Sequence, residues 1–379
     1  MKLYAKILAV VLVLLMTVSL VGCGQSGTIK IGAIMPITGQ VSLYGTQSQK
    51  AMQMYVDELN AKGGINGQKV TLIVEDDEAT PEKSVNAFKK LTAQDKVVAF
   101  VGALTSKCSN AITSEAQAKK IVMLSSSSTA DEVTDAGDFV FRACYNDSFQ
   151  GVVVSQFAFE TVGAKKAAIL FDNANDYSKG LTETFKANFL ALGGEIVAEE
   201  SYNTGDKDFA AQITKIKGTS PDVIFIPDYY STVSVIAKQV REQGITVPMM
   251  GADGWDGVTA EAGDEVIDCY FSNHYAADSD DADVKRFVAA YKAKYNEDPN
   301  ALAALAYDSI VILTDAIAKA GSMDSQKIRD ALAATDKKVV TGQIKFNEKR
   351  NPVKSAVMVK IVKGADGKLT TQYAGTVNP

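Results

Sequence analysis

Short apolar runs alternate with amphipathic stretches along most of this chain. Residues 29–37 are an apolar run with β-branched residues, which is the pattern of a buried strand. Residues 46–60 then carry apolar positions at helical spacing, and the Gly-rich turn at 61–67 ends that helix. Because the same order recurs down the chain, the pattern predicts an α/β protein with mainly parallel sheets.

Two successive series of strands and helices predict two parallel sheets, each with helices on both faces. A helix-start signal stands at Thr80-Pro81, as N-cap and first helical residue. Further strands are expected at residues 70–74, 97–101, 121–124, 139–144, 167–171, 196–201, 223–226, 249–250, 266–271, 342–346, 356–362 and 370–374. Further helices are expected at residues 106–119, 149–161, 177–192, 209–216, 232–243, 284–295, 302–320 and 325–333.

The first 22 residues predict a secretory signal that is not part of the fold. Lys2 and Lys6 precede an apolar run too short for a membrane span. The run ends in Leu-Val-Gly-Cys, which resembles the lipobox of bacterial lipoproteins. That resemblance implies that Cys23 is the first mature residue and carries a lipid, with 23–27 as a tether. A plain secreted protein with an unrelated cysteine is the alternative.

Residues 22–27 also match G-x-G-x-x-G, the fingerprint of dinucleotide-binding sites. That motif binds a pyrophosphate only where it lies between a strand and a helix. Here a leader precedes it and a polar tether follows it. We therefore exclude a dinucleotide site and expect no cofactor.

Composition excludes several other classes of function. The 379 residues suggest two domains or one large domain, and 39 basic against 45 acidic residues give a net charge of −6. Because there is no basic excess, a nucleic-acid partner is not expected. A single histidine, His274, rules out an HExxH metal site, and four cysteines without a CxxC pair argue against a zinc ribbon. No metal site is expected.

Hydroxyl residues follow two neighbouring strands of the first predicted sheet. Thr105 and Ser106 come after the third strand, and residues 125–129, Ser-Ser-Ser-Ser-Thr, come after the fourth. Ligands of parallel α/β sheets bind at the carboxyl ends of the strands. Hydroxyls and backbone N–H groups at helix starts suit a carboxylate or another small anion. Simple helix capping explains the same residues equally well.

The second half of the chain offers the opposite charge. Asp253 follows the 249–250 strand in a Gly-rich loop beside Trp255. A carboxylate at this place can bind an ammonium group, and an N-cap role for Asp253 explains its position equally well. Tyr44, Tyr177 and Tyr229 follow other strands and can line a pocket, although each alone is more often rim packing. Together with the hydroxyl loops, these residues suit an amino acid held between two domains.

Four segments carry a family resemblance that covers nearly the whole chain after about residue 28. They are Ile-Gly-Ala-Ile-Met-Pro-Ile-Thr-Gly at 31–39, Asn-Ala-Lys-Gly-Gly-Ile-Asn-Gly at 60–67, Asp76-Asp77 with Pro81, and Phe-Val-Gly at 100–102. With them the chain resembles the type I periplasmic solute-binding proteins, most closely the leucine/isoleucine/valine-binding branch. The resemblance implies two Rossmann-like lobes joined by three crossings. It places lobe 1 at 28–146 and 275–350, and lobe 2 at 147–274 and 351–379.

The resemblance also implies roles for individual residues. Ser106 stands where the family's serine contacts the ligand carboxylate, Ser127 where a small residue offers its carbonyl, and Thr129 where a threonine contacts both charged groups. Asp253 stands where an acidic residue, often Glu, binds the ammonium group. Tyr177, Tyr229 and Tyr44 match aromatic cleft positions. Asp253 is shorter than the Glu that is often found there, and Trp255 and Tyr230 are bulkier than expected for this branch. These differences mean that the resemblance does not specify which side chain the ligand has.

The expected function is that of a lipid-anchored, extracytoplasmic solute-binding protein of an ABC importer. Its expected ligand is a branched-chain or other apolar amino acid, bound by hinge closure, and its expected partner is a membrane permease. We expect a monomer and no enzymatic activity. Alternatives are an amide or small carboxylate as ligand, a sensory role, or a secreted α/β hydrolase. The hydrolase lacks a GxSxG motif and would need His274 as its base.

The cysteines support one further hypothesis. Cys144 and Cys269 each end a predicted strand before a lobe crossing, and crossings in the expected fold run side by side. An exported protein can pair them, which would leave Cys108 as a buried apolar residue. Three unpaired buried thiols are at least as well supported.

Overall fold

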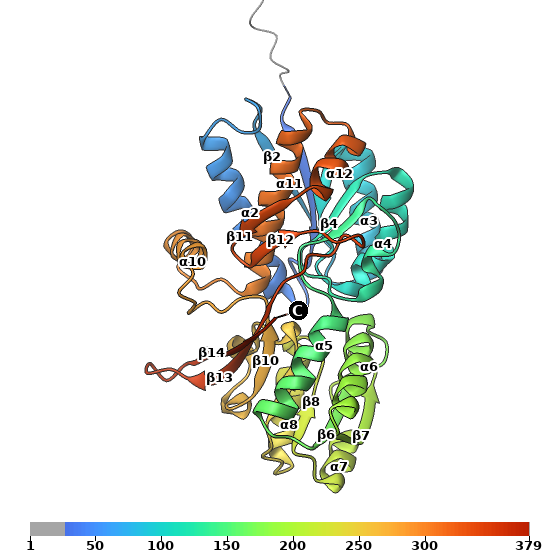
Figure 1. Cartoon of the computed structure of the whole chain (residues 1–379), viewed down its shortest axis with the longest axis vertical. Helices are drawn as coiled ribbons and strands as arrows, with labels where there is room; N and C mark the ends of the chain where they lie inside the picture. Colours follow the sequence, from blue (N-terminus) through green and yellow to red (C-terminus); the bar gives the residue numbers. More distant parts are fainter. Residues whose placement is uncertain (1–26, 379) are drawn as a thin grey trace, which may run out of the picture.

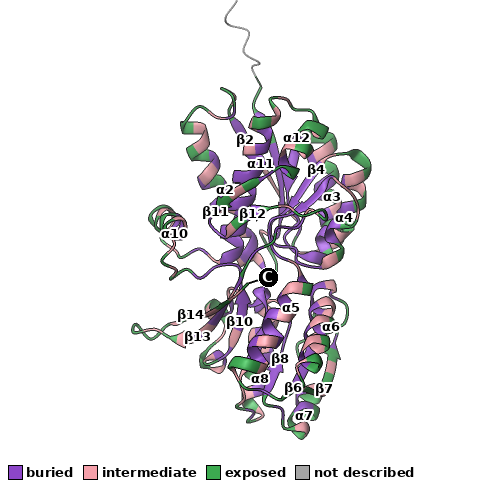
Figure 2. Cartoon of the chain, viewed as in Figure 1, coloured by how far each residue is buried: buried purple, intermediate pink, exposed green. Residues whose placement is uncertain are grey.

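The computed structural model describes residues 27–378 and places them in two lobes along the long axis of the molecule (Figure 1). Each lobe is built on its own sheet, as the alternating pattern predicted. The central strands of both sheets are buried, whereas edge strands such as β14 are partly exposed, and the outer faces of the helices carry many exposed residues (Figure 2). The signal sequence, Cys23 and the tether predicted before residue 27 lie outside the described residues.

The first lobe contains a five-stranded sheet in the order β2-β1-β3-β4-β5, and every pair in it is parallel. The carboxyl ends of its strands lie along one edge of the sheet, and the loops after the paired strands β3 and β4 are neighbours at that edge. The strands are β1 (Ile29–Met35), β2 (Val70–Asp76), β3 (Ala99–Val101), β4 (Val122–Ser125) and β5 (Val140–Arg142). The helices include α2 (Ser42–Ala61), α3 (Pro81–Lys89), α4 (Ser106–Lys119), α11 (Ala301–Ala320) and α12 (Ser325–Ala333).

Helix α11 is the core helix of the first lobe. By length and composition it could cross a membrane, but most of its residues are buried inside the protein. It packs along α2 and contacts β3 and β4. Asn300 begins the helix, because its side chain accepts from the Ala303 N–H, and Gly321 ends it with a left-handed backbone. The apolar pattern of this helix therefore reflects burial in the lobe.

The second lobe contains a seven-stranded sheet in the order β14-β13-β10-β9-β8-β6-β7. Five strands are parallel, while β13 runs antiparallel to both β10 and β14. The strands are β6 (Lys166–Asp172), β7 (Glu195–Tyr202), β8 (Val223–Phe225), β9 (Met249–Gly251), β10 (Tyr270–Asn273), β13 (Ala356–Lys363) and β14 (Leu369–Val377). The helices include α5 (Asp147–Gln156), α6 (Asp176–Ala191), α7 (Ala210–Thr219) and α8 (Tyr230–Glu242).

One predicted strand has the wrong bounds and one strand was missed. The strand expected at 266–271 is β10, which begins only at Tyr270, because a 3-10 turn occupies Asp264–Val266. The strand expected at 342–346 is confirmed as β12 (Gly342–Lys345), which forms a hairpin with β11 (Asp336–Val339) outside the two large sheets. Strand β11 was not predicted, because its sequence Asp-Lys-Lys-Val has no apolar alternation.

Three connections join the lobes. They lie at residues 143–146 between β5 and α5, at 274–281 between β10 and α10 (Ala282–Tyr295), and at 346–355 between β12 and β13. The hairpin β13–β14 extends to one side near these connections (Figure 1). The lobe boundaries derived from the family resemblance stay a prediction.

The hypothesis that Cys144 pairs with Cys269 was wrong. Both thiols and that of Cys108 are free and buried. Cys269 precedes Tyr270, the first residue of β10, and lies beside Arg241. It is therefore at the opposite end of β10 from the crossing, whereas Cys144 lies within the first crossing. Burial raises the pKa of all three thiols, so they remain protonated.

The lobes are closed on each other. Main-chain and side-chain groups on the facing edges of the two lobes make direct hydrogen bonds across the cleft. These run from the Tyr44 hydroxyl to the Gly254 carbonyl, from the Leu43 N–H to the Tyr230 hydroxyl (3.2 Å), from the Ala301 N–H to the Asp256 carboxylate, and from the Asn110 amide to the Asp176 carboxylate (3.1 Å).

A buried carboxyl in the second lobe should make stability depend on pH. Asp228 accepts from the Tyr202 hydroxyl and from the Tyr229 N–H, and burial raises its pKa from 3.8 to about 7. Between pH 4 and 7 the folded protein therefore holds a proton that the unfolded chain has lost. Stability contributed by this group falls as pH rises through that window.

We predict that Asp228→Asn becomes more stable relative to the wild type as pH rises from 5 to 8. The gain should be roughly 1–3 kcal/mol, because the amide cannot ionise. Urea unfolding at both pH values measures it, with Glu242→Gln, an exposed site on the same lobe, as control. If the unfolding free energies of Asp228→Asn and the wild type differ by the same amount at pH 5 and at pH 8, the prediction is contradicted.

Candidate functional site

A small enclosed cavity lies where the two lobes meet. Its volume is about 20 Å³, which is room for about one water molecule. Lobe 1 contributes Tyr44, Leu104, Thr105, Ser106, Ser127 and Leu302, and lobe 2 contributes Tyr177, Tyr229, Asp253 and Gly254. Six of the eight ligand-binding residues predicted from the sequence therefore lie around one space.

The wall from lobe 1 presents hydroxyl and N–H groups. Ser106 is the first residue of α4, where backbone N–H groups lack partners within the helix. Its hydroxyl oxygen accepts from the Ala130 N–H at 3.2 Å, so its hydroxyl hydrogen is left for a ligand. Ser127 follows β4 and donates to the Leu104 carbonyl at 2.8 Å. This wall suits a small anionic group.

The wall from lobe 2 presents the carboxylate of Asp253, which is 4% exposed. One carboxylate oxygen accepts from the Gln150 amide at 3.0 Å and from the Tyr177 hydroxyl at 2.9 Å. The other oxygen lies 2.9 Å from His274 Nε2. Asp253 also donates its own N–H to Gln150 at 3.1 Å. Three side chains of lobe 2 thus fix the direction in which this carboxylate points.

Tyrosine rings form the apolar part of the cavity wall. Tyr177 and Tyr229 stack with centroids 5.1 Å apart. Tyr44 comes from lobe 1 and meets Tyr229 edge to face at 6.1 Å and Tyr230 at 4.9 Å. Tyr44 therefore reaches across the cleft to the aromatic residues of the other lobe.

Two predicted site residues do not line the cavity. Trp255 is buried in the core, and its Nε1 donates to the Ile226 carbonyl at 2.8 Å. Thr129 is also buried, and its side chain interacts with Asp147, the first residue of α5. Both residues therefore lie outside the cavity wall.

His274 was considered only as a base for an enzyme, yet it holds the carboxylate of Asp253. It follows β10 directly, and its ring stacks on Tyr145 with centroids 3.9 Å apart. Burial lowers the pKa of His274 in spite of the Asp253 hydrogen bond, so the ring is neutral at pH 7. A neutral ring with Nε2–H donates to Asp253, while Nδ1 has no partner among residues 27–378.

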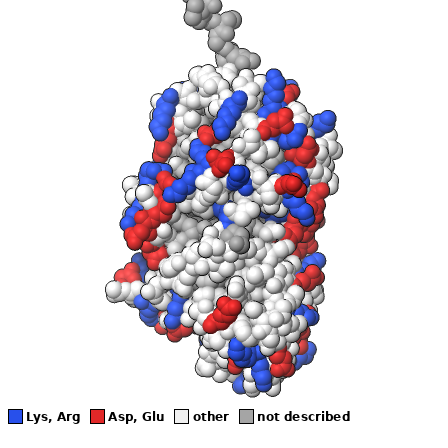
Figure 3. Space-filling view, in the orientation of Figure 1, with Lys and Arg blue, Asp and Glu red and all other residues white. Residues whose placement is uncertain are grey.

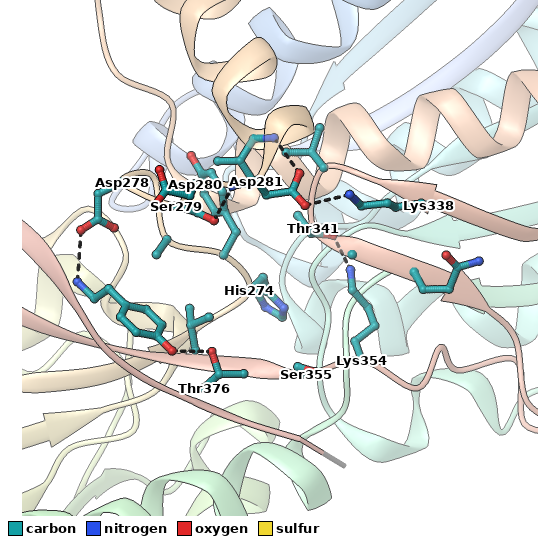
Figure 4. A pocket seen from close by; sticks show the side chains of 18 of the residues that line it. His274, Asp278, Ser279, Asp280, Asp281, Lys338, Thr341, Lys354, Ser355 and Thr376 are labelled. Atoms are coloured by element: carbon teal, nitrogen blue, oxygen red, sulfur yellow. Dashed lines mark hydrogen bonds and ion pairs between the residues drawn. The ribbon is translucent and has the colours of Figure 1, made fainter.

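A larger groove of about 640 Å³ lies on the hinge side of the lobes (Figure 4). Residues of the second and third crossings line it, among them His274 and Lys354, together with the β11–β12 hairpin. Lys354 is buried and donates to Thr341 and to the Ala143 carbonyl at 3.2 Å. His274 thus lies between this groove and the cavity between the lobes.

The described residues hold no cluster of His, Cys, Asp and Glu side chains that could bind a metal ion.

On the face shown in Figure 3, basic and acidic side chains are intermixed over the first lobe. Ion pairs between partly exposed side chains include Lys50–Glu297 and Lys294–Asp57.

Known proteins resemble this chain over nearly its whole length. The family described as "Periplasmic binding protein" matches residues 28–368. A leucine-, isoleucine-, valine-, threonine- and alanine-binding protein of Pseudomonas aeruginosa is 30% identical, over 85% of this chain and 86% of its own. A Leu/Ile/Val-binding protein of Rhizobium johnstonii is 32% identical, over 80% and 83% of the two chains.

Solved structures agree with the sequence comparison. A leucine-binding protein of Thermotoga maritima superposes with a TM-score of 0.87 at 32% identity, over 93% of this chain and 99% of its own. A branched-chain amino acid transporter substrate-binding protein of Streptococcus pneumoniae, in complex with isoleucine, gives a TM-score of 0.84 at 36% identity, over 93% and 100%. The predicted fold class and family are confirmed: this chain belongs to the periplasmic binding proteins, the type I substrate-binding proteins of ABC transporters.

Proposed function

We propose that this protein binds a branched-chain or other apolar α-amino acid between its lobes and delivers it to a membrane permease. One observation carries the proposal. The hydroxyl and N–H groups around Ser106 and Ser127 in lobe 1 share a single enclosed space with the Asp253 carboxylate of lobe 2. A zwitterion placed there has its carboxylate on one lobe and its ammonium on the other, so it joins them.

The hydrogen bonds of Asp253 support an ammonium group as the missing partner. An ionised carboxylate accepts about four hydrogen bonds. Gln150, Tyr177 and His274 occupy three of these positions. The fourth, on the oxygen that faces His274, remains for a ligand donor. No lysine or arginine pairs with Asp253 among residues 27–378, and the ring of His274 that contacts it is neutral, so a cationic ligand group would balance its charge.

The apolar walls support an apolar side chain. The rings of Tyr44, Tyr177 and Tyr229 and the side chains of Leu104 and Leu302 supply the apolar surface of the cavity wall. The relatives reported above are named for leucine, isoleucine and valine, and one was solved with isoleucine. These names agree with the ligand class that the walls suit.

A ligand without an ammonium group is the second candidate. A solute-binding protein of Rhodopseudomonas palustris, 25% identical, was solved with 3,4-dihydroxybenzoic acid. Such a ligand would leave Asp253 charged and unpaired in a closed cleft, which is costly. The amino acid is therefore favoured.

Binding would act through the lobes. Direct hydrogen bonds already join the lobes at the cavity wall and beside it, and a ligand that also bridges the lobes shifts the open–closed equilibrium toward the closed form. The enclosed space is much smaller than an amino acid. The lobes must therefore separate for entry, and the tyrosine walls must lie farther apart in the loaded form.

A thermal-shift screen of the twenty amino acids, with leucinamide and benzoate added, tests the function. We predict stabilisation by leucine, isoleucine or valine, of roughly 2.7 kcal/mol at a concentration of 100 times Kd. Stabilisation by benzoate and by none of the amino acids would overturn the proposal in favour of the second candidate.

Asp253→Asn should weaken amino acid binding at least about a hundredfold. The amide keeps the size of the side chain and removes its charge, and breaking one partner of a buried charge pair costs about 3–5 kcal/mol. Calorimetric titration with the best ligand measures the change, and Glu261→Gln, an exposed site near the same loop, is the matched control. Affinity within threefold of the wild type, with folding intact, would place the ammonium elsewhere.

The lipid anchor is part of the proposal and rests on the Leu-Val-Gly-Cys sequence that ends at Cys23. Cys23→Ala should release the protein into the medium or leave an uncleaved precursor. Cell fractionation and the mass of the N-terminal peptide measure both. Wild-type protein found wholly in the medium, with an unmodified N-terminal peptide, would refute the anchor.

A further inference from the structure

An arginine without an ion-pair partner lies buried behind the loop that supplies Ser127. Arg142 is the last residue of β5, and its side chain is completely buried. Its guanidinium donates to the carbonyl oxygens of four consecutive residues of the 128–131 segment. The bonds are to Ser128 at 3.1 Å, Thr129 at 2.7 Å, Ala130 at 2.7 Å and Asp131 at 2.9 Å.

This bonding pattern sets the direction of the N–H groups of the same segment. In a trans peptide the C=O and the following N–H point in opposite directions. When carbonyls 128–130 turn toward Arg142, the N–H groups of 129–131 turn away from it. The Ala130 N–H shows the result, because it donates to the hydroxyl oxygen of Ser106, which lines the cavity. Arg142 thus helps turn the Ala130 N–H toward the ligand side, where it holds the hydroxyl of Ser106.

The positive charge of Arg142 is not balanced nearby. No ion pair joins it to a carboxylate among the described residues, and its Nε–H has no acceptor there. Asp147 is a buried acid that interacts with it, and burial raises the pKa of Asp147 well above that of an exposed aspartate, which favours the neutral form. Because the surroundings are buried, the field of Arg142 is weakly screened.

We propose that Arg142 is a specificity-determining positioning residue, which makes lobe 1 select ligands with a free carboxylate. It does so by holding the 128–131 carbonyls away from the ligand and by placing an unbalanced positive charge behind the loop. Arg142 does not touch the ligand. The proposal deepens the proposed function and rests on it, since it assumes that an α-amino acid occupies the cavity.

The test compares leucine with leucinamide, which keeps the ammonium and lacks the carboxylate. Arg142→Met removes charge and donors, and Arg142→Lys keeps the charge with fewer donors. Arg350→Met is the matched control, because the Arg350 guanidinium also binds carbonyls of this lobe, those of Val140 (3.0 Å) and Thr134 (2.6 Å), outside the 128–131 segment. Calorimetric Kd values for both ligands and the unfolding midpoint without ligand are measured for each variant.

We expect Arg142→Met to weaken leucine binding at least about tenfold and leucinamide binding less than threefold, because only leucine has the carboxylate. Arg142→Lys should weaken leucine binding less than Arg142→Met does. Arg350→Met should leave the ratio of the Kd values for leucine and leucinamide unchanged. Equal losses for both ligands in folded Arg142→Met would overturn the proposal and leave Arg142 a purely structural role.

The wild type supplies a second measurement if the Arg142 variants fail to fold. Selection for a carboxylate requires the wild type to bind leucine at least about tenfold more tightly than leucinamide. A smaller preference would overturn the proposal without any variant. Wild type that binds neither leucine nor leucinamide is a different result, since it would refute the proposed function itself.

Discussion

The burial of one carboxylate constrains the rest of this site. Asp253 is almost completely enclosed, and an ionised group in such a place is costly unless donors surround it. Gln150 on α5, Tyr177 on α6 and His274 after β10 provide those donors. Each comes from a different element of lobe 2, so the packing of that lobe fixes the carboxylate before any ligand arrives.

The two walls of the cleft are prepared in different ways. In lobe 2 a network of side chains holds an anion, whereas in lobe 1 backbone groups and serine hydroxyls are turned toward the same space. Arg142 and Lys354, both buried, donate mainly to backbone carbonyls of loops and crossings. Buried cations are thus used in this protein to shape irregular backbone near the hinge, where regular ladders cannot supply partners.

The sequence predicted the lobes and much of the cavity because both follow from strand order. Ser106, Ser127 and Asp253 stand directly after apolar runs, and parallel strands bring their carboxyl ends together. Strand β11 was missed, because a short charged strand carries little periodicity. Strands β12 and β13 were predicted, but the sequence pattern did not show the antiparallel pairing of β12 with β11 and of β13 with β10.

The supporting residues of the site were mostly invisible in the sequence. A lone glutamine such as Gln150 carries no signal, since only the fold brings it to Asp253. Arg142 did carry a signal, because it is a charged residue within the apolar run 139–144. A strand that is buried on both faces contains such a residue only where the charged group has hydrogen-bonding partners. Trp255 was placed at the site because it neighbours Asp253, but its large ring is turned into the core.

The tight closure of the cleft also sets a limit on how strongly the protein can hold its cargo. The hydrogen bonds from Tyr44 to Gly254 and from Leu43 to Tyr230 join the two lobes directly. Bonds of this kind stabilise a closed form with or without cargo, so a closed form without cargo competes with the loaded one, and the apparent Kd rises by the inverse of the fraction of molecules able to accept cargo. Affinity is therefore a property of the direct contacts between the lobes as much as of the contacts of the ligand, and Leu43 and Tyr230, which lie outside the cavity wall, can tune it.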